Sequence, residues 1–150
     1  GILAKGSFRG YTIEPIIRHG NPVSVGQCQG EKELLAEAER VLTGWREDGY
    51  DTIAVICRNE AEAAQTAKKL AVRIPIEGGD LETAEFKSGI MVFPVNYTKG
   101  LEFDAVLLYN PTEADYPADD GHAKLLYVAA TRALHELAVL HTGDLSGLLR

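Results

Sequence analysis

The chain has 150 residues, of which 45% are hydrophobic and 25% are charged, with a formal net charge of −7. This composition is typical of a globular domain with its own core, and it excludes disordered, fibrous and disulfide-stapled proteins because only two cysteines are present. The acidic balance and the scattered basic residues also exclude a strongly basic nucleic-acid-binding surface. We expect a single domain over residues 1–150. No apolar run approaches the ~20 residues that span a bilayer, and the N-terminus lacks a signal-peptide pattern, so we expect a cytoplasmic protein without a membrane partner.

The first half of the chain predicts a β-rich start followed by alternating strands and helices. Residues 11–17 alternate loosely, and residues 23–25 form a short strand after a turn. Apolar side chains at helical spacing then predict an amphipathic helix over 31–48. The continuous apolar run 52–57 indicates a central parallel strand. A second helix is predicted over 60–71, with Asn59 as its cap.

The second half predicts three further strands and one helix. A polar stretch over 77–89 precedes a strand over 90–95, and a strand over 105–109 follows. A helix over about 122–134 and a last strand over 136–141 complete the series. The order β-α-β-α-β-β-α-β predicts an α/β fold, a mostly parallel sheet with helices on both faces.

Several conspicuous residues receive structural interpretations. Cys57 is expected to be a buried thiol, and Trp45 is expected to pack in the core rather than stack on a base. The acidic stretch 113–120 is interpreted as a solvated connecting loop rather than a calcium site. The four histidines show no metal-ligand spacing with the cysteines, so no metal site is predicted.

Two segments of the second half are candidates for function. In parallel sheets ligands bind beyond the carboxyl ends of strands, and we expect the segment Thr98–Asp104 to lie there. Gly100 permits a tight turn, while Lys99 and Glu102 are opposite charges that could also form a plain surface ion pair. Arg132 is expected near the end of the last helix. It either complements the helix dipole or stabilises charge on a transferred phosphoryl group.

The amino-acid sequences of these two segments resemble motifs of a known family of motor proteins. The string K-G-L-E-F-D-A-V over residues 99–106 resembles motif V of UvrD/Rep-type superfamily 1 helicases, and L-Y-V-A-A-T-R-A over residues 126–133 resembles their motif VI. The exact wording is most similar to the HelD (helicase IV-like) branch. The pattern G-x-x-x-x-G-K-[ST], which cradles nucleotide phosphates, is absent from the sequence. The resemblance therefore implies the second RecA-like domain of such a helicase, with the first domain upstream.

The resemblance also implies roles for particular residues. Arg132 would reach across the inter-domain cleft to the γ-phosphate of ATP, whose Mg²⁺ is held mainly by the absent first domain. Glu102 would lie near the nucleotide sugar, with Gly100 shaping the turn. Thr98 and Lys99 would lie between the ATP cleft and the single-stranded DNA. The isolated chain is expected to be inactive.

Three departures from the family pattern stand out. Pro94 and Asn96 occupy the positions of a common T-x-H sequence, which leaves Asn96 as a candidate phosphate contact. The stretch 7–9 echoes motif IV only faintly, and we transfer no role to Arg9. The large accessory domain found before motif V in UvrD has no counterpart here.

The sequence leaves two further interpretations open. The HelD resemblance implies that the parent could instead be an ATP-switched factor that binds and remodels RNA polymerase. A stand-alone small-ligand α/β domain with accidental motif matches is the other alternative.

Overall fold

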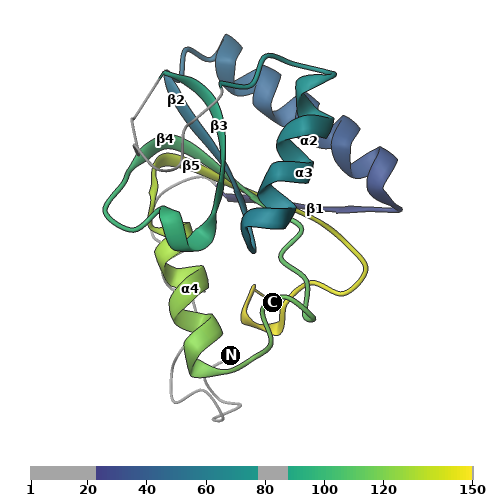
Figure 1. The fold of residues 1–150 in the computed structure, drawn as a ribbon, viewed down its shortest axis with the longest axis vertical. Coiled ribbons are helices and arrows are strands. Elements are labelled where there is room, and N and C mark those ends of the chain that lie inside the picture. Colours follow the sequence, from purple (N-terminus) through teal and green to yellow (C-terminus); the bar gives the residue numbers. More distant parts are fainter. Residues whose placement is uncertain (1–22, 78–87, 150) are drawn as a thin grey trace.

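The computed structural model describes residues 23–77 and 88–149, which form one five-stranded sheet (Figure 1). The strand order is β1-β5-β4-β2-β3, and every neighbouring pair is parallel. The strands are β1 (Val23–Cys28), β2 (Thr52–Cys57), β3 (Gly89–Pro94), β4 (Phe103–Tyr109) and β5 (Ala133–Thr142). Because all of these strands run in the same direction, the sheet has one edge of amino ends and one edge of carboxyl ends.

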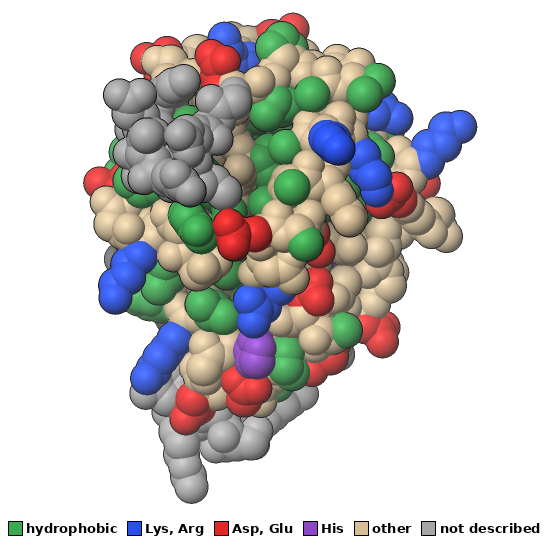
Figure 2. Space-filling model, in the orientation of Figure 1, with side chains coloured by type: hydrophobic (Ala, Val, Ile, Leu, Met, Phe, Trp, Pro, Cys, Tyr) green, Lys and Arg blue, Asp and Glu red, His purple; other side chains and the backbone are tan. Residues whose placement is uncertain are grey.

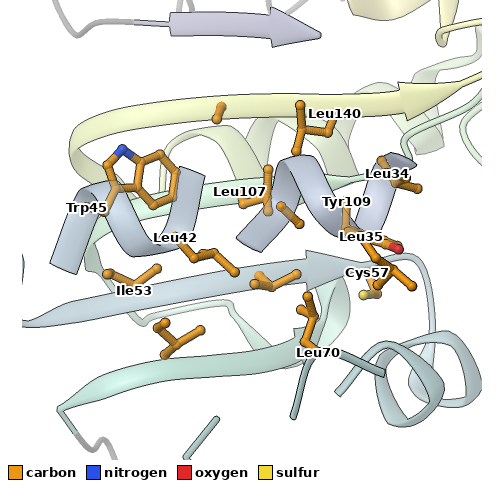
Figure 3. Packing of buried hydrophobic residues seen from close by; sticks show 14 of the residues in the cluster. Leu34, Leu35, Leu42, Trp45, Ile53, Cys57, Leu70, Leu107, Tyr109 and Leu140 are labelled. Carbon is orange, nitrogen blue, oxygen red and sulfur yellow. The ribbon is translucent and has the colours of Figure 1, made fainter. Parts of the chain in front are cut away.

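Helices cover both faces of this sheet. Helices α2 (Glu31–Glu47) and α3 (Glu60–Ala71) pack on one face, while α4 (Asp120–Ala130) packs on the other (Figure 1). Each interface is a separate buried hydrophobic cluster. Figure 3 shows the first of them, in which Trp45 and Leu42 of α2 lie over the sheet.

Local signals in the sequence explain where two of the helices begin. The Asn59 side chain accepts a hydrogen bond from the Glu62 N–H, 2.9 Å, and so caps α3. Asp119 does the same for α4 by accepting from the His122 N–H at 2.8 Å. Such caps satisfy backbone donors that have no partner within the helix. Both capped N-termini lie at the carboxyl edge of the sheet.

The predicted α/β fold and its order of elements are confirmed over the described residues. The predicted strand over 52–57 and helix over 60–71 match the structure at both ends, and the helix predicted over 31–48 ends one residue earlier. Predictions for residues 1–22, including Arg9, and for most of 77–89 lie outside the described residues. Within the described part of the chain, no helix is long and apolar enough to cross a membrane.

Two buried residues also behave as predicted. Trp45 is 3% exposed, and Cys57 is fully buried at the end of β2. Burial raises the pKa of the Cys57 thiol to about 12, which outweighs the hydrogen bond with Thr66. The thiol therefore stays protonated at neutral pH and is a poor nucleophile.

We predict that Leu126→Ala destabilises the domain strongly. Leu126 is fully buried on α4, the helix that covers its face of the sheet within the described residues. Truncation should lower the free energy of unfolding by about 2–5 kcal/mol, because it removes apolar contact and leaves a cavity. Urea unfolding of the chain measures this. Val72→Ala, at a side chain that is 87% exposed, should change stability by less than about 0.5 kcal/mol. Equal effects of the two substitutions would contradict the packing of α4.

Candidate functional site

The segment between β3 and β4 carries the chain from one edge of the sheet to the other. It leaves β3 at Pro94, forms the 3₁₀ helix Val95–Tyr97, which contacts α4, and reaches the first residue of β4, Phe103. β3 and β4 both run parallel to β2, which lies between them. The end of this segment therefore lies at the amino edge. The expectation that residues 98–104 all lie beyond the carboxyl ends is wrong, because a short crossover between parallel strands must return to the amino edge.

A tight turn at Gly100 directs this return. Gly100 has φ +84°, and the Leu101 N–H donates to the Thr98 carbonyl at 3.0 Å. A positive φ at the third residue of a four-residue turn strongly favours glycine. A Cβ atom at Gly100 would meet no other atom within 4 Å. Backbone conformation, rather than crowding, is therefore what demands glycine here.

Arg132 lies in the short link between α4 and β5. The helix ends at Ala130, and Thr131 follows as its C-cap, with a hydroxyl that donates to the carbonyl of Tyr127 at 2.7 Å. The Arg132 carbonyl accepts from the Phe103 N–H at 2.8 Å. The sequence prediction of a helix to residue 134 is thus wrong at its end, because pairing with β4 starts a strand at Ala133. Leu134 belongs to β5 and is 45% exposed.

The guanidinium group of Arg132 is only partly satisfied. One terminal nitrogen, Nη2, donates to the Thr131 hydroxyl at 3.1 Å. The Nε atom is buried and has no hydrogen-bond partner among the described residues. No carboxylate in the described part of the chain forms an ion pair with this side chain. A buried donor without a partner costs about 1–3 kcal/mol, and a planar cation with free N–H groups is suited to bind an oxyanion.

Glu102 joins this site through the backbone. It directly precedes Phe103, whose N–H bonds to Arg132, so Glu102 and Arg132 lie at the amino ends of neighbouring strands. Glu102 is exposed, whereas Arg132 is half-buried. A β-bulge follows, since two steps along β4 from Phe103 match three steps along β5 from Ala133. Bulges of this kind re-aim side chains next to functional sites.

Asp104 fastens the same edge to β2. Its carboxylate accepts the N–H groups of Asp51 and Thr52 at 2.9 and 3.1 Å, and its own N–H donates to the Thr52 hydroxyl at 3.0 Å. Burial alone would raise the pKa of Asp104, but these donated hydrogen bonds and nearby His135 outweigh it and hold the pKa below its ordinary value. Asp104 belongs to the string that resembles motif V, but the string predicts no role for it. Its side-chain partners are 52 and 53 residues away, so no local pattern points to them.

The residues predicted to contact nucleic acid differ in their exposure. Asn96 and Lys99 are exposed, while Thr98 is fully buried and its hydroxyl donates to the Val95 carbonyl at 2.7 Å. The structure adds Tyr97, which is 38% exposed between them and donates to Glu60 at 3.3 Å. Tyr127 of α4 is 47% exposed. On the face drawn in Figure 2 acidic and basic side chains are both scattered, and its described surface shows no continuous basic band.

The acidic side chains and backbone of the loop 113–120 make hydrogen bonds that hold the loop in place. Glu113 accepts the Gly147 N–H at 2.6 Å, Asp119 caps α4, and the Asp115 carbonyl accepts from Arg58 at 3.0 Å. Among the residues that the structure describes, no three acidic, histidine or cysteine side chains are grouped as metal ligands. These hydrogen bonds agree with its interpretation as a connecting loop.

Comparisons with known proteins find similarity to helicases over the part of the chain that contains this site. Residues 89–140 match the model of the UvrD-like helicase C-terminal domain, and this range contains Gly100, Glu102 and Arg132. The chain is also similar to the crystal structure of the C-terminal domain of a possible DNA helicase from Lactobacillus plantarum WCFS1. The TM-score is 0.78 and the identity 28%, covering 93% of this chain and 84% of that one. No curated protein matches the sequence.

We predict opposite effects of adding a methyl group at two glycines. Gly100→Ala should destabilise the chain by about 1–2 kcal/mol, because alanine disfavours a positive φ. Gly44→Ala, inside α2 where a Cβ would also meet nothing within 4 Å, should stabilise by about 0.5–1 kcal/mol. Urea unfolding of both variants measures the difference. If Gly100→Ala proved as stable as the parent, the turn assigned here would be wrong.

We predict that Asp104 makes stability depend on pH in the acid range. The folded pKa of Asp104 is lowered, so its stabilisation is present above the unfolded pKa of about 3.9 and is lost as pH falls through the folded pKa. Asp104→Asn should therefore cost about 1–2 kcal/mol at pH 7, and the difference from the parent should shrink below pH ~4. Denaturant unfolding at a series of pH values tests this.

The matched control is Asp144→Asn. This aspartate is exposed, and its carboxylate accepts no hydrogen bond from the described residues. The same chemical change should alter stability there by less than about 0.5 kcal/mol. A pH-independent difference between the parent and the Asp104 variant would contradict the role given to the carboxylate.

Proposed function

We propose that the chain is the second RecA-like motor domain of an ATP-dependent DNA helicase or translocase of the UvrD type. The observation that carries this proposal is the state of Arg132. Its guanidinium is half-buried at the amino edge, has an unpartnered Nε, and is tied through Phe103 to Glu102. The match of residues 89–140 to a helicase C-terminal domain supports the same interpretation.

In this proposal ATP and Mg²⁺ bind mainly to the first motor domain, and this chain completes the site. Arg132 supplies a permanent positive charge with N–H groups for a γ-phosphate oxygen, and arginines in this role accelerate phosphoryl transfer by ~10³ to 10⁵. Glu102, exposed beside it, would accept hydrogen bonds from the nucleotide sugar. Gly100 and Asp104 act through position, because they fix where β4 begins.

Single-stranded DNA is the proposed second ligand. Exposed Asn96 and Lys99 provide an amide and an ammonium for phosphate contacts, while the buried Thr98 side chain leaves only its backbone for such a role. These residues belong to the segment that ends at Glu102. A movement of this segment on domain closure would therefore act on both ligands, which is the coupling that a translocase requires.

The finer placement in the helicase IV-like branch stays a prediction from the wording of the two motifs. The alternative that the full-length protein binds and remodels RNA polymerase rests on the same similarity of the motifs to the HelD branch. If the full-length protein hydrolysed ATP without separating a DNA duplex, and co-purified with RNA polymerase, these results would favour that alternative.

We predict that Arg132→Ala nearly abolishes ATP turnover by the full-length protein that contains this chain. The loss should be on the order of 10³-fold in kcat with unchanged folding, because the side chain stabilises charge only during phosphoryl transfer. Steady-state hydrolysis with and without single-stranded DNA measures it. The chain alone should show no hydrolysis.

Arg73→Ala serves as the control for loss of an arginine. Arg73, just after α3, pairs with Glu39 of α2 at 2.9 Å, and its loss should leave turnover within about twofold. Near-normal hydrolysis by the Arg132 variant, in a protein whose turnover responds to DNA, would contradict the assignment.

A further inference from the structure

A polar cavity lies at the carboxyl edge of the sheet, opposite the Arg132 site. Its volume is about 290 Å³, at the low end of the range for small-ligand pockets. Its walls include Tyr109 and Asn110 at the end of β4 and Thr142 at the end of β5. The first turns of α2 and α3 contribute Glu31 and Glu62. This edge of a parallel sheet is where ligands commonly bind.

Tyr109 contributes a hydroxyl group to the cavity. Its side chain is only 7% exposed and packs in the same cluster as Leu35 and Cys57 (Figure 3). The hydroxyl has no hydrogen bond to any described residue. Burial raises the pKa of Tyr109, so the hydroxyl stays neutral and can both donate and accept. The side chain is more than nine-tenths buried and lines the cavity, so a ligand or water in this space can supply the partner of the hydroxyl.

The charges around the cavity select the kind of ligand. Glu31 is already paired with Lys69 at 2.7 Å. Glu62 accepts the Arg58 N–H at 3.0 Å through Oε1, and its other carboxylate oxygen has no partner among the described residues. The Asn59 side chain already accepts a hydrogen bond from the Glu62 N–H, so this donor at the N-terminus of α3 is not available to an anion. The cavity therefore has one carboxylate in excess, in a partly buried position that favours a cation.

An organic cation fits better than a metal ion. Within the described parts of the chain no three acidic, histidine or cysteine side chains are grouped to hold a metal. On the far wall the Asn110 side-chain oxygen accepts from the Thr142 N–H at 2.9 Å and from the Thr142 hydroxyl at 3.3 Å. The oxygen of that hydroxyl can still accept a hydrogen bond, as can the Tyr109 hydroxyl. Neutral oxygen acceptors beside one carboxylate match the several N–H donors of an ammonium or guanidinium group.

We propose that this cavity binds a small organic cation through an ammonium or guanidinium group, with the Glu62 carboxylate as its charged acceptor and the Tyr109 hydroxyl as a second acceptor. The site is separate from the nucleotide site proposed above. It lies at the other edge of the sheet and selects the opposite charge.

Titration of the chain with agmatine, followed by amide shifts in ¹H–¹⁵N spectra, tests this proposal. We expect saturable shifts at Glu62, Gln65, Asn110 and Thr142, which line the cavity. Glu62→Gln keeps the shape and removes the charge, and should weaken binding by on the order of tenfold or more. Tyr109→Phe should weaken it about threefold and provides a second test if the first variant does not fold.

Glu60→Gln is the matched control, because Glu60 lies in the same helical turn outside the cavity lining. Its affinity for agmatine should stay within about twofold of the parent. Inorganic phosphate, titrated in parallel, should cause no saturable shifts at the same amides. Absence of saturable agmatine binding, binding unchanged by Glu62→Gln, or phosphate binding in its place would overturn the proposal.

Discussion

The hydrogen bond from the Phe103 N–H to the Arg132 carbonyl holds together the two segments from which the site is built. One segment arrives from β3 through the Gly100 turn, and the other arrives from α4 through the Thr131 cap. At that point Phe103 is the first residue of β4, while Arg132 lies in the link between α4 and β5. Pairing of β4 with β5 is what brings Glu102 and Arg132 to the same edge. Side-chain chemistry at this site therefore depends on backbone pairing, and the Asp104 bonds to β2 extend that pairing to a third strand.

Different charged side chains line the two proposed sites, and this difference separates their proposed ligands. At the amino edge Arg132 is a cation without a carboxylate partner among the described residues, which suits a phosphate. At the carboxyl edge Glu31 and Glu62 occupy the first turns of two helices, where an anion would otherwise be favoured. A nucleotide is thus disfavoured at the edge where parallel sheets commonly bind one. This arrangement agrees with the proposal that ATP binds mainly to a first motor domain and that this chain completes the site with Arg132.

Sequence reasoning succeeded where local patterns decide structure. Helical spacing, the Asn59 cap and the apolar run of β2 gave the order of elements and the ends of α3. It failed where distant pairing decides: α4 ends early because β5 begins to pair at Ala133, and the segment after β3 crosses to the amino edge. The resemblance to motifs V and VI implied one nucleotide site for Arg132 and Glu102, but no local pattern showed that pairing of β4 with β5 brings them together. The partners of Asp104 and the acidic cavity could not be predicted, since both join segments far apart in the sequence.

The position of Arg132 separates its contribution to folding from its proposed contribution to chemistry. Its backbone N–H and carbonyl both make hydrogen bonds, to Ala129 and Phe103, and these persist whatever side chain is present. The guanidinium adds one bond to the Thr131 hydroxyl, which is already bonded to the carbonyls of Tyr127 and Val128. Its buried Nε costs free energy rather than contributing it. A side chain retained at such a cost is more readily explained by a ligand than by the stability of the fold.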